Sequence, residues 1–130
     1  MMPVSKCSPS STFSILDLQS EVGLLLRTLN VYVVLWRFRP LKDRESEFER
    51  AYSPSGEWTR LFRRGEGYIG TELLQGSDDP REHLVLDRWA SRAAYEAFRA
   101  RFGSDYRRLD SRLEGLTEEE APIGTFEILS

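Results

Sequence analysis

The chain has 130 residues, 40% of them hydrophobic, and a formal net charge of −3, which fits one domain that buries its own core. Its one cysteine excludes an internal disulfide and, with one histidine, speaks against a zinc site, so we expect a cytoplasmic protein without a bound metal. The 18 basic and 21 acidic residues speak against nucleic-acid binding, and no apolar run approaches the roughly 18 residues that span a membrane.

The first thirty residues are expected to form an extension ahead of the main domain. Residues 1–12 are small, polar and proline-containing, which predicts a poorly ordered leader. Residues 14–29 carry apolar side chains at steps of three and four, as in an amphipathic helix. Three roles stay open for this helix: it caps the core, docks on a partner subunit or lies outside the real domain. The main domain is expected to span residues 31–130.

The first half of the main domain predicts a strand followed by two short helices. Residues 31–38 are β-branched and aromatic and stop before Pro40, which is typical of a strand. One helix is expected to begin near Asp43. The other covers residues 57–64 and is expected to end at Gly65 as a left-handed cap.

The second half predicts a hairpin, a long helix and a last strand. Residues 67–75 and 82–90 read as strands joined by a short turn, which indicates an antiparallel hairpin. Ser91 is a good N-cap for a helix with a long apolar stripe, and Gly103 is expected to kink or split that helix. The last strand is expected to follow Pro122.

The order β, α, β, β, α, β predicts an α+β, ferredoxin-like fold, with helices on one face of an antiparallel sheet. Residues 31–38 are apolar on both faces of their strand, since Tyr32 and Val34 alternate with Val33 and Leu35. An apolar second face needs a covering layer. We therefore expect a homodimer in which two such sheets face each other.

The octet RGEGYIGT, residues 64–71, resembles two binding motifs. Its glycines have the G-x-G-x-x-G spacing of dinucleotide-binding loops, but a helix precedes it and a strand follows, which reverses the required order. It also approaches an RNA-binding octet, but Glu66 and Thr71 stand where that motif has stacking aromatics. We interpret the octet as a helix end and a strand entry. His83 and the acidic run 118–120 are interpreted as solvated groups rather than a general base and a metal site.

Many aromatic side chains fall on elements that are expected to meet between the sheet and the helices. Aromatics at such spacing usually form core, but they also suit an apolar pocket for a flat aromatic ligand. Both interpretations stay open from the sequence. The residues expected to line such a pocket are Trp36, Phe38, Tyr52, Trp58, Phe62 and Phe98.

The stretch LDRWASRAAYEAF, residues 86–98, resembles the W-x-S-x-x-A-[FY] strand-to-helix junction of the antibiotic-biosynthesis-monooxygenase-like family. GYIGTELL resembles the second strand of that family, and the similarity covers residues 31–129. The resemblance implies a dimeric α+β barrel. One branch of the family oxidises polycyclic phenols with molecular oxygen and no cofactor, and it uses an asparagine, a tryptophan, a tyrosine and an arginine around an aromatic pocket.

The similarity to this quinone-forming branch implies site residues in the present chain. Trp89 and Tyr95 stand at the positions of its tryptophan and tyrosine, whereas Val85 replaces its asparagine. The candidates for its arginine are Arg107, Arg108 and Arg112. We therefore predict Trp89, Tyr95 and Arg108 as catalytic residues.

The heme-degrading branch matches poorly, because Phe98 occupies the position of its tryptophan and no histidine follows His83. The resemblance thus favours a cofactor-independent monooxygenase for a small aromatic or polyphenolic substrate. The alternative is a non-catalytic small-molecule-binding or assembly module of the same fold. That alternative predicts a pocket filled by the protein's own Trp58, Phe62 and Phe98.

Overall fold

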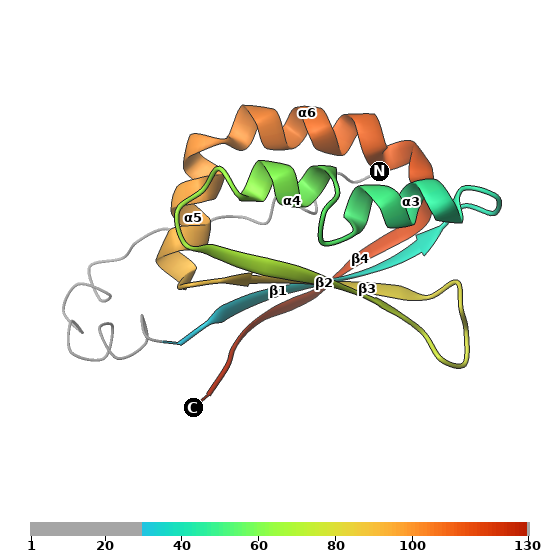
Figure 1. Cartoon of the computed structure of the whole chain (residues 1–130), viewed down its shortest axis with the longest axis horizontal. Coiled ribbons are helices and arrows are strands. Elements are labelled where there is room, and N and C mark those ends of the chain that lie inside the picture. The colour runs from blue at the N-terminus through green and yellow to red at the C-terminus, as the bar shows by residue number, and fades with distance from the viewer. Residues whose placement is uncertain (1–29, 130) are drawn as a thin grey trace.

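The computed structural model describes residues 30–129, and its helices all lie on one face of a four-stranded antiparallel sheet (Figure 1). The elements are β1 Tyr32–Pro40, α3 Glu45–Tyr52, α4 Glu57–Phe62, β2 Tyr68–Gln75, β3 His83–Trp89, α5 Arg92–Arg101, α6 Gly103–Leu113, a 3₁₀ turn Glu114–Leu116 and β4 Thr117–Glu127. The strand order β2-β3-β1-β4 confirms the α+β, ferredoxin-like prediction. No helix within residues 30–129 is long and apolar enough to cross a membrane. The extension and its predicted helix lie outside the described residues.

The junction between β3 and the next helices follows the prediction closely. Ser91 is the N-cap of α5, and its hydroxyl accepts a 3.0 Å hydrogen bond from the Ala94 backbone N–H. The long apolar stripe is divided into α5 and α6 at Gly103, as expected. Phe102 sits between the two helices with non-helical backbone angles. α5 contacts β3, whereas α6 contacts α4 and α5.

The last strand differs from the prediction. It begins at Thr117 and not after Pro122, so the acidic run is part of β4. Pro122 pairs with Trp36 at an irregularity in the register with β1. A proline is tolerated there because β4 is an edge strand whose second side has no hydrogen-bonded neighbour in the sheet.

One glycine of the octet has another role than expected. Gly67, not Gly65, has the left-handed backbone, with φ of 90°. A side chain at Gly67 would place its Cβ 2.7 Å from the Ala94 Cβ of α5. A Cβ at Gly65 would lie 2.7 Å from the Phe98 ring. Both glycines thus let the chain pass close beneath α5, and the prediction of a left-handed cap at Gly65 was wrong.

Gly67→Ala is expected to lower the free energy of unfolding by about 1–3 kcal/mol, because alanine is strained at positive φ and would clash with Ala94. Urea unfolding followed by circular dichroism measures the change. Gly70→Ala is the matched control, since a Cβ there meets nothing within 4 Å. Equal losses in both variants would contradict the assigned role of Gly67.

Strand alternation decides which side chains enter the core. Tyr32, Val34, Trp36 and Phe38 of β1 face the helices, and the register with β3 sets opposite them Trp89, Asp87, Val85 and His83. All eight of these side chains are buried. The helix-facing layer is therefore mostly aromatic, but it contains one aspartate and one histidine.

The opposite face of the sheet is apolar too. Leu35 of β1 pairs with Leu86 of β3, and Leu84 pairs with Leu74 of β2. Leu74 is 42% exposed and Phe126 of β4 is 49% exposed. No helix of the described chain covers this face (Figure 1). We call it the open face.

Candidate functional site

The predicted pair Trp89 and Tyr95 lies at the end of β3 and the start of α5. Their rings are 5.5 Å apart, and they are 0% and 6% exposed. The Ser91 cap fixes the first turn of α5, which sets Tyr95 above Trp89. The structure therefore brings these two residues together on the helix-facing side of the sheet.

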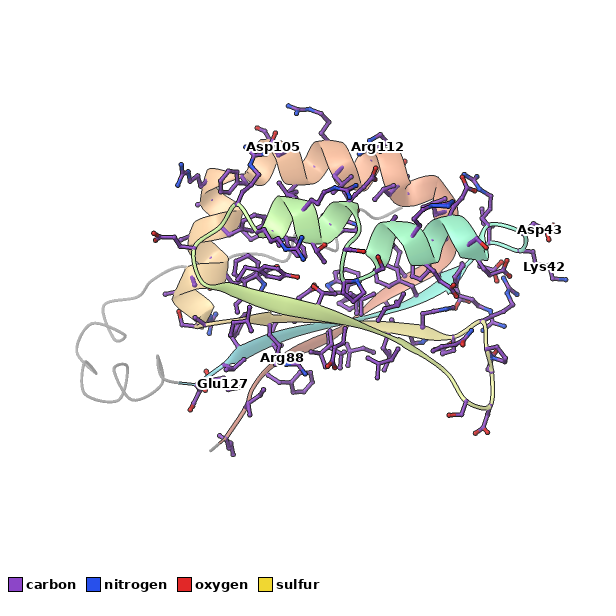
Figure 2. The ribbon with its side chains drawn as sticks, in the orientation of Figure 1. Lys42, Asp43, Arg88, Asp105, Arg112 and Glu127 are labelled. Atoms are coloured by element: carbon purple, nitrogen blue, oxygen red, sulfur yellow. The ribbon has the colours of Figure 1, made fainter. Side chains whose placement is uncertain are left out.

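The predicted Arg108 does not join them. Its side chain is 74% exposed and pairs with Asp105 at 3.1 Å. Figure 2 labels Asp105 and Arg112 on α6, where Arg112 binds Glu57 of α4 at 3.2 Å. In these contacts, Arg108 and Arg112 pair with carboxylates of α6 and α4 and not with Trp89 or Tyr95.

Arg99 of α5 takes the place expected for Arg108. Its Nη1 donates to the Tyr95 hydroxyl oxygen at 3.1 Å. Its guanidinium lies 3.8 Å over the ring of Tyr106, which is a cation–π contact. The sequence carried a signal for this residue, because Arg99 follows Tyr95 by four positions on one helix. The family similarity pointed instead to the arginines after Gly103.

The six predicted pocket aromatics are all buried, at 3% exposure or less. Phe62 and Phe98 meet edge-on at 5.4 Å, and Phe98 lies 5.0 Å from Trp89. Phe62 also lies 5.7 Å from Trp58. These rings are in mutual contact, so a ligand enters between them only if side chains move. This packing is the one expected for the closed-core alternative.

Buried polar groups share this aromatic layer, and the sequence predictions missed them. Asp87 of β3 and Asp110 of α6 are each 3% exposed. Tyr52 of α3 lies near both carboxylates. The pKa of its hydroxyl is raised far above its usual range, mainly by burial and to a lesser extent by the charge of Glu120. Strand parity was the available signal for Asp87, because it lies two residues from Trp89.

A hydrogen-bonded chain connects Asp87 to the β2 strand. Thr71 Oγ1 lies 2.7 Å from Asp87 Oδ1, and the Tyr68 hydroxyl lies 2.5 Å from Thr71 Oγ1. Burial raises the pKa of the Tyr68 hydroxyl, and the hydrogen bond to Thr71 opposes this in part. Tyr68 also packs edge-on against Trp89, with ring centroids 5.2 Å apart. The polar chain thus borders the predicted site.

His83 is not the solvated group that the sequence suggested. It is 1% exposed, and its ring meets Phe48 edge-on at 5.1 Å. Nδ1 lies 3.1 Å from the Arg81 carbonyl oxygen and Nε2 lies 3.3 Å from Glu49 Oε2. This histidine links β3 to α3 at the far end of β3 from Trp89, which indicates a structural role.

The acidic run on β4 forms ion pairs. Glu118 lies 3.1 Å from Arg81, and Glu119 lies 3.4 Å from Arg37. No group of three or more potential ligands in residues 30–129 is arranged to hold a metal ion. The run therefore pairs with arginines of β1 and of the hairpin turn, while Glu118 and Glu119 stay 38% and 55% exposed, as expected for solvated groups.

Comparison with known families identifies the chain. The model of the antibiotic biosynthesis monooxygenase family matches residues 31–103. The chain belongs to this family. The matched region includes β1 to α5 and so contains Asp87, Trp89, Tyr95 and Arg99. No curated protein matches the chain.

Solved structures have the same fold at low sequence identity. A variant of SnoaB, a cofactor-independent oxygenase from Streptomyces nogalater, is 19% identical, with a TM-score of 0.61 over 77% of this chain and 94% of that one. Rv0793 from Mycobacterium tuberculosis is 21% identical, with a TM-score of 0.57 over 77% and 96%. A putative antibiotic biosynthesis monooxygenase from Nitrosomonas europaea is 16% identical, with a TM-score of 0.57 over 76% and 90%. At such low sequence identity, these similarities establish only the fold of the present chain.

Proposed function

We propose that this family member is a cofactor-independent monooxygenase that converts a small, electron-rich phenol to a quinone on the helix-facing side of its sheet. The observation that carries the proposal is the carboxylate of Asp87, which is 3% exposed within an aromatic layer and lies two residues from Trp89 on the same strand face. Family membership and the fold shared with a cofactor-independent oxygenase support it.

The reaction balances without a cofactor. A phenol and one molecule of oxygen give a quinone and water: one oxygen atom forms the new carbonyl and the other leaves as water. The phenol supplies every electron that the oxygen accepts, so no external reductant is required. The protein has to remove the phenolic proton, because the phenolate is the electron-rich form that reacts with oxygen, and to keep the site dry.

The side chains have distinct proposed roles. Asp87 accepts the phenolic proton. Arg99 donates to the Tyr95 oxygen, and we propose that the Tyr95 hydroxyl donates to the substrate oxyanion. Trp89 and the aromatic set around it exclude water and contact the ring of the substrate. Arg99 replaces Arg108 in this assignment. The residues proposed to contact the substrate are still Trp36, Phe38, Tyr52, Trp58, Phe62 and Phe98.

Oxygen uptake with a panel of electron-rich phenols tests the proposal. Metal-free protein is expected to turn over at least one phenol, and Tyr95→Phe is expected to lower kcat/KM about 100-fold through loss of one oxyanion donor. Tyr32→Phe is the matched control, because Tyr32 is a buried tyrosine 5.7 Å from Tyr95. If no phenol on a broad panel supports uptake by the wild type, the enzyme assignment fails.

A non-catalytic module is the second candidate, and the mutual contacts of Phe62, Phe98, Trp58 and Trp89 favour it. Quenching of tryptophan fluorescence by naphthol separates the two candidates. An aromatic substrate site predicts saturable quenching, since naphthol would displace side chains beside Trp58 and Trp89. A permanently closed core predicts no quenching up to the solubility limit of naphthol.

We also propose that a second copy of the chain covers the open face. Leu35 and Leu86 lie at its centre, and 49% of Phe126 is exposed there. Light scattering is expected to give twice the chain mass of 15.1 kDa for the wild type and the single mass for Leu86→Asp, whose charge would be buried at the interface. Ser111→Asp, on the exposed side of α6, should remain dimeric. A monomeric wild type would refute the facing-sheet arrangement.

A further inference from the structure

Three side chains on the helix-facing side of the β2–β3 hairpin form a continuous hydrogen-bonded chain. The Tyr68 hydroxyl lies 2.5 Å from Thr71 Oγ1, which lies 2.7 Å from Asp87 Oδ1. Tyr68 is partly exposed, whereas Thr71 is 8% exposed and Asp87 is 3% exposed. The chain therefore runs from the surface of the hairpin to a carboxylate inside the core.

A bulge in β2 makes this chain possible. Residues three apart on a regular strand point to opposite faces. Tyr68 pairs with Trp89 and Gly70 pairs with Arg88, so Ile69 is an extra residue between two consecutive partners. The extra residue brings the Tyr68 side chain to the same face as Thr71, and Ile69 itself is 53% exposed. Without the bulge, the Tyr68 hydroxyl would face away from Thr71.

The hydrogen bonds of this chain have a defined direction. An ionised Asp87 only accepts, so the Thr71 hydroxyl donates to it. The Thr71 oxygen then accepts from the Tyr68 hydroxyl. Burial raises the pKa of the Tyr68 hydroxyl, so it retains its proton and remains a donor at neutral pH. The Tyr68 and Thr71 hydroxyls therefore each donate a hydrogen bond along the chain, and the Asp87 carboxylate accepts the last one.

We propose that Tyr68, Thr71 and Asp87 form a proton relay that carries the phenolic proton of the substrate from Asp87 to the solvent at Tyr68. The proposal rests on the proposed oxygenase function for the origin of the proton. It adds two side chains, Tyr68 and Thr71, that the family similarity does not assign. They do not contact the reacting atoms and act as positioning and relay groups for Asp87.

The relay has two steps, and each proton has a destination. In the first, the O–H bond of the phenol breaks and an O–H bond forms on Asp87, which becomes neutral. The hydroxyls of Thr71 and Tyr68 then turn to donate outward. In the second, Asp87 gives its proton to the Thr71 oxygen, Thr71 gives its own to the Tyr68 oxygen, and Tyr68 gives its own to water. Asp87 returns to its ionised state, and the oxygen atom that leaves the substrate as hydroxide takes up one proton from solvent to become water, so the overall reaction still balances.

Replacement of the central hydroxyl tests the relay. Thr71→Val is expected to lower kcat for naphthol-dependent oxygen uptake about 10- to 100-fold with KM nearly unchanged, and to increase the solvent deuterium isotope effect on kcat. Thr71→Ser keeps the hydroxyl and should restore kcat to within about threefold of the wild type. Thr59→Val is the matched control, since Thr59 is 0% exposed and its hydroxyl donates to the Gly56 carbonyl oxygen and not to a member of the relay. It should retain wild-type kcat.

Proton NMR of the ligand-free protein provides a readout that does not require turnover. The short hydrogen bonds of the wild type are expected to give exchange-protected hydroxyl signals that disappear in Thr71→Val and persist in Thr59→Val. Equal kcat and equal isotope effects in the wild type and Thr71→Val would overturn the relay, as would absence of the hydroxyl signals. Protected signals without uptake of oxygen by the wild type would support the hydrogen-bonded chain and refute the oxygenase function.

Discussion

Asp87→Asn is expected to lower kcat for oxygen uptake by about 100-fold or more, because an amide cannot take up the phenolic proton. Asparagine has nearly the same shape and keeps an oxygen that can accept from Thr71, so the hydrogen bond at 2.7 Å can persist. The loss should therefore appear in kcat rather than in the fold. Steady-state oxygen uptake with naphthol, with circular dichroism as a check on folding, measures it.

A second buried carboxylate provides the control for Asp87→Asn. Asp110 of α6 is also 3% exposed, and the proposed relay does not use it. Asp110→Asn is expected to lower kcat by less than about tenfold, as a change of environment without loss of the base. If both variants lose the same activity, or if Asp87→Asn keeps the wild-type rate, Asp87 is not the base.

Trp89→Ala is expected to lower the free energy of unfolding by about 3–5 kcal/mol, the usual range for truncation of a buried aromatic side chain. Trp89 is 0% exposed, and its ring contacts those of Phe62, Tyr68, Tyr95 and Phe98 at 5.0–5.7 Å. Truncation would leave a cavity among these rings. Urea unfolding at one fixed protein concentration measures the loss, since dimerisation would couple stability to concentration.

Trp89→Phe separates ring packing from the indole N–H. The Trp89 Nε1 is buried and has no hydrogen-bond partner within residues 30–129, so its removal leaves no acceptor unsatisfied. Phenylalanine should therefore restore more than half of the stability that alanine loses. Equal losses in the two variants would show that the indole nitrogen, and not the packing of the ring, stabilises this position.

Local sequence patterns predicted those elements whose local preferences agree with the fold. Residues 31–38 combine β-branched and aromatic residues, and they form most of β1. The beginning of β4 was missed because Thr117 followed by three glutamates reads locally as a helix start. In the structure, pairing with β1 and the contact of Glu119 with Arg37 hold this segment extended. A preference that depends on a distant strand is not visible in a local window.

The candidate site was predictable only in part for the same reason. The family motif placed Trp89 and Tyr95, whose relation depends on one strand end and one helix turn. Arg99 was missed because the family similarity pointed to the arginines after Gly103, although Arg99 lies one helical turn from Tyr95 in α5. The link between Tyr68 and Asp87 depends on a bulge in β2, and no local pattern in the octet predicts this bulge. Long-range register thus decided which polar groups meet in the core.

Oxidation of naphthol under ¹⁸O₂ tests the central claim most directly. Purified protein, stripped of metal by a chelator and free of flavin and heme absorbance, would be given naphthol in ordinary water, and the product analysed by mass spectrometry. We expect a quinone with one oxygen atom from ¹⁸O₂, formed by the wild type and about 100-fold more slowly by Asp87→Asn. A quinone without the label, or a product that forms only after a metal or flavin is added, would contradict cofactor-independent oxygenation by this chain.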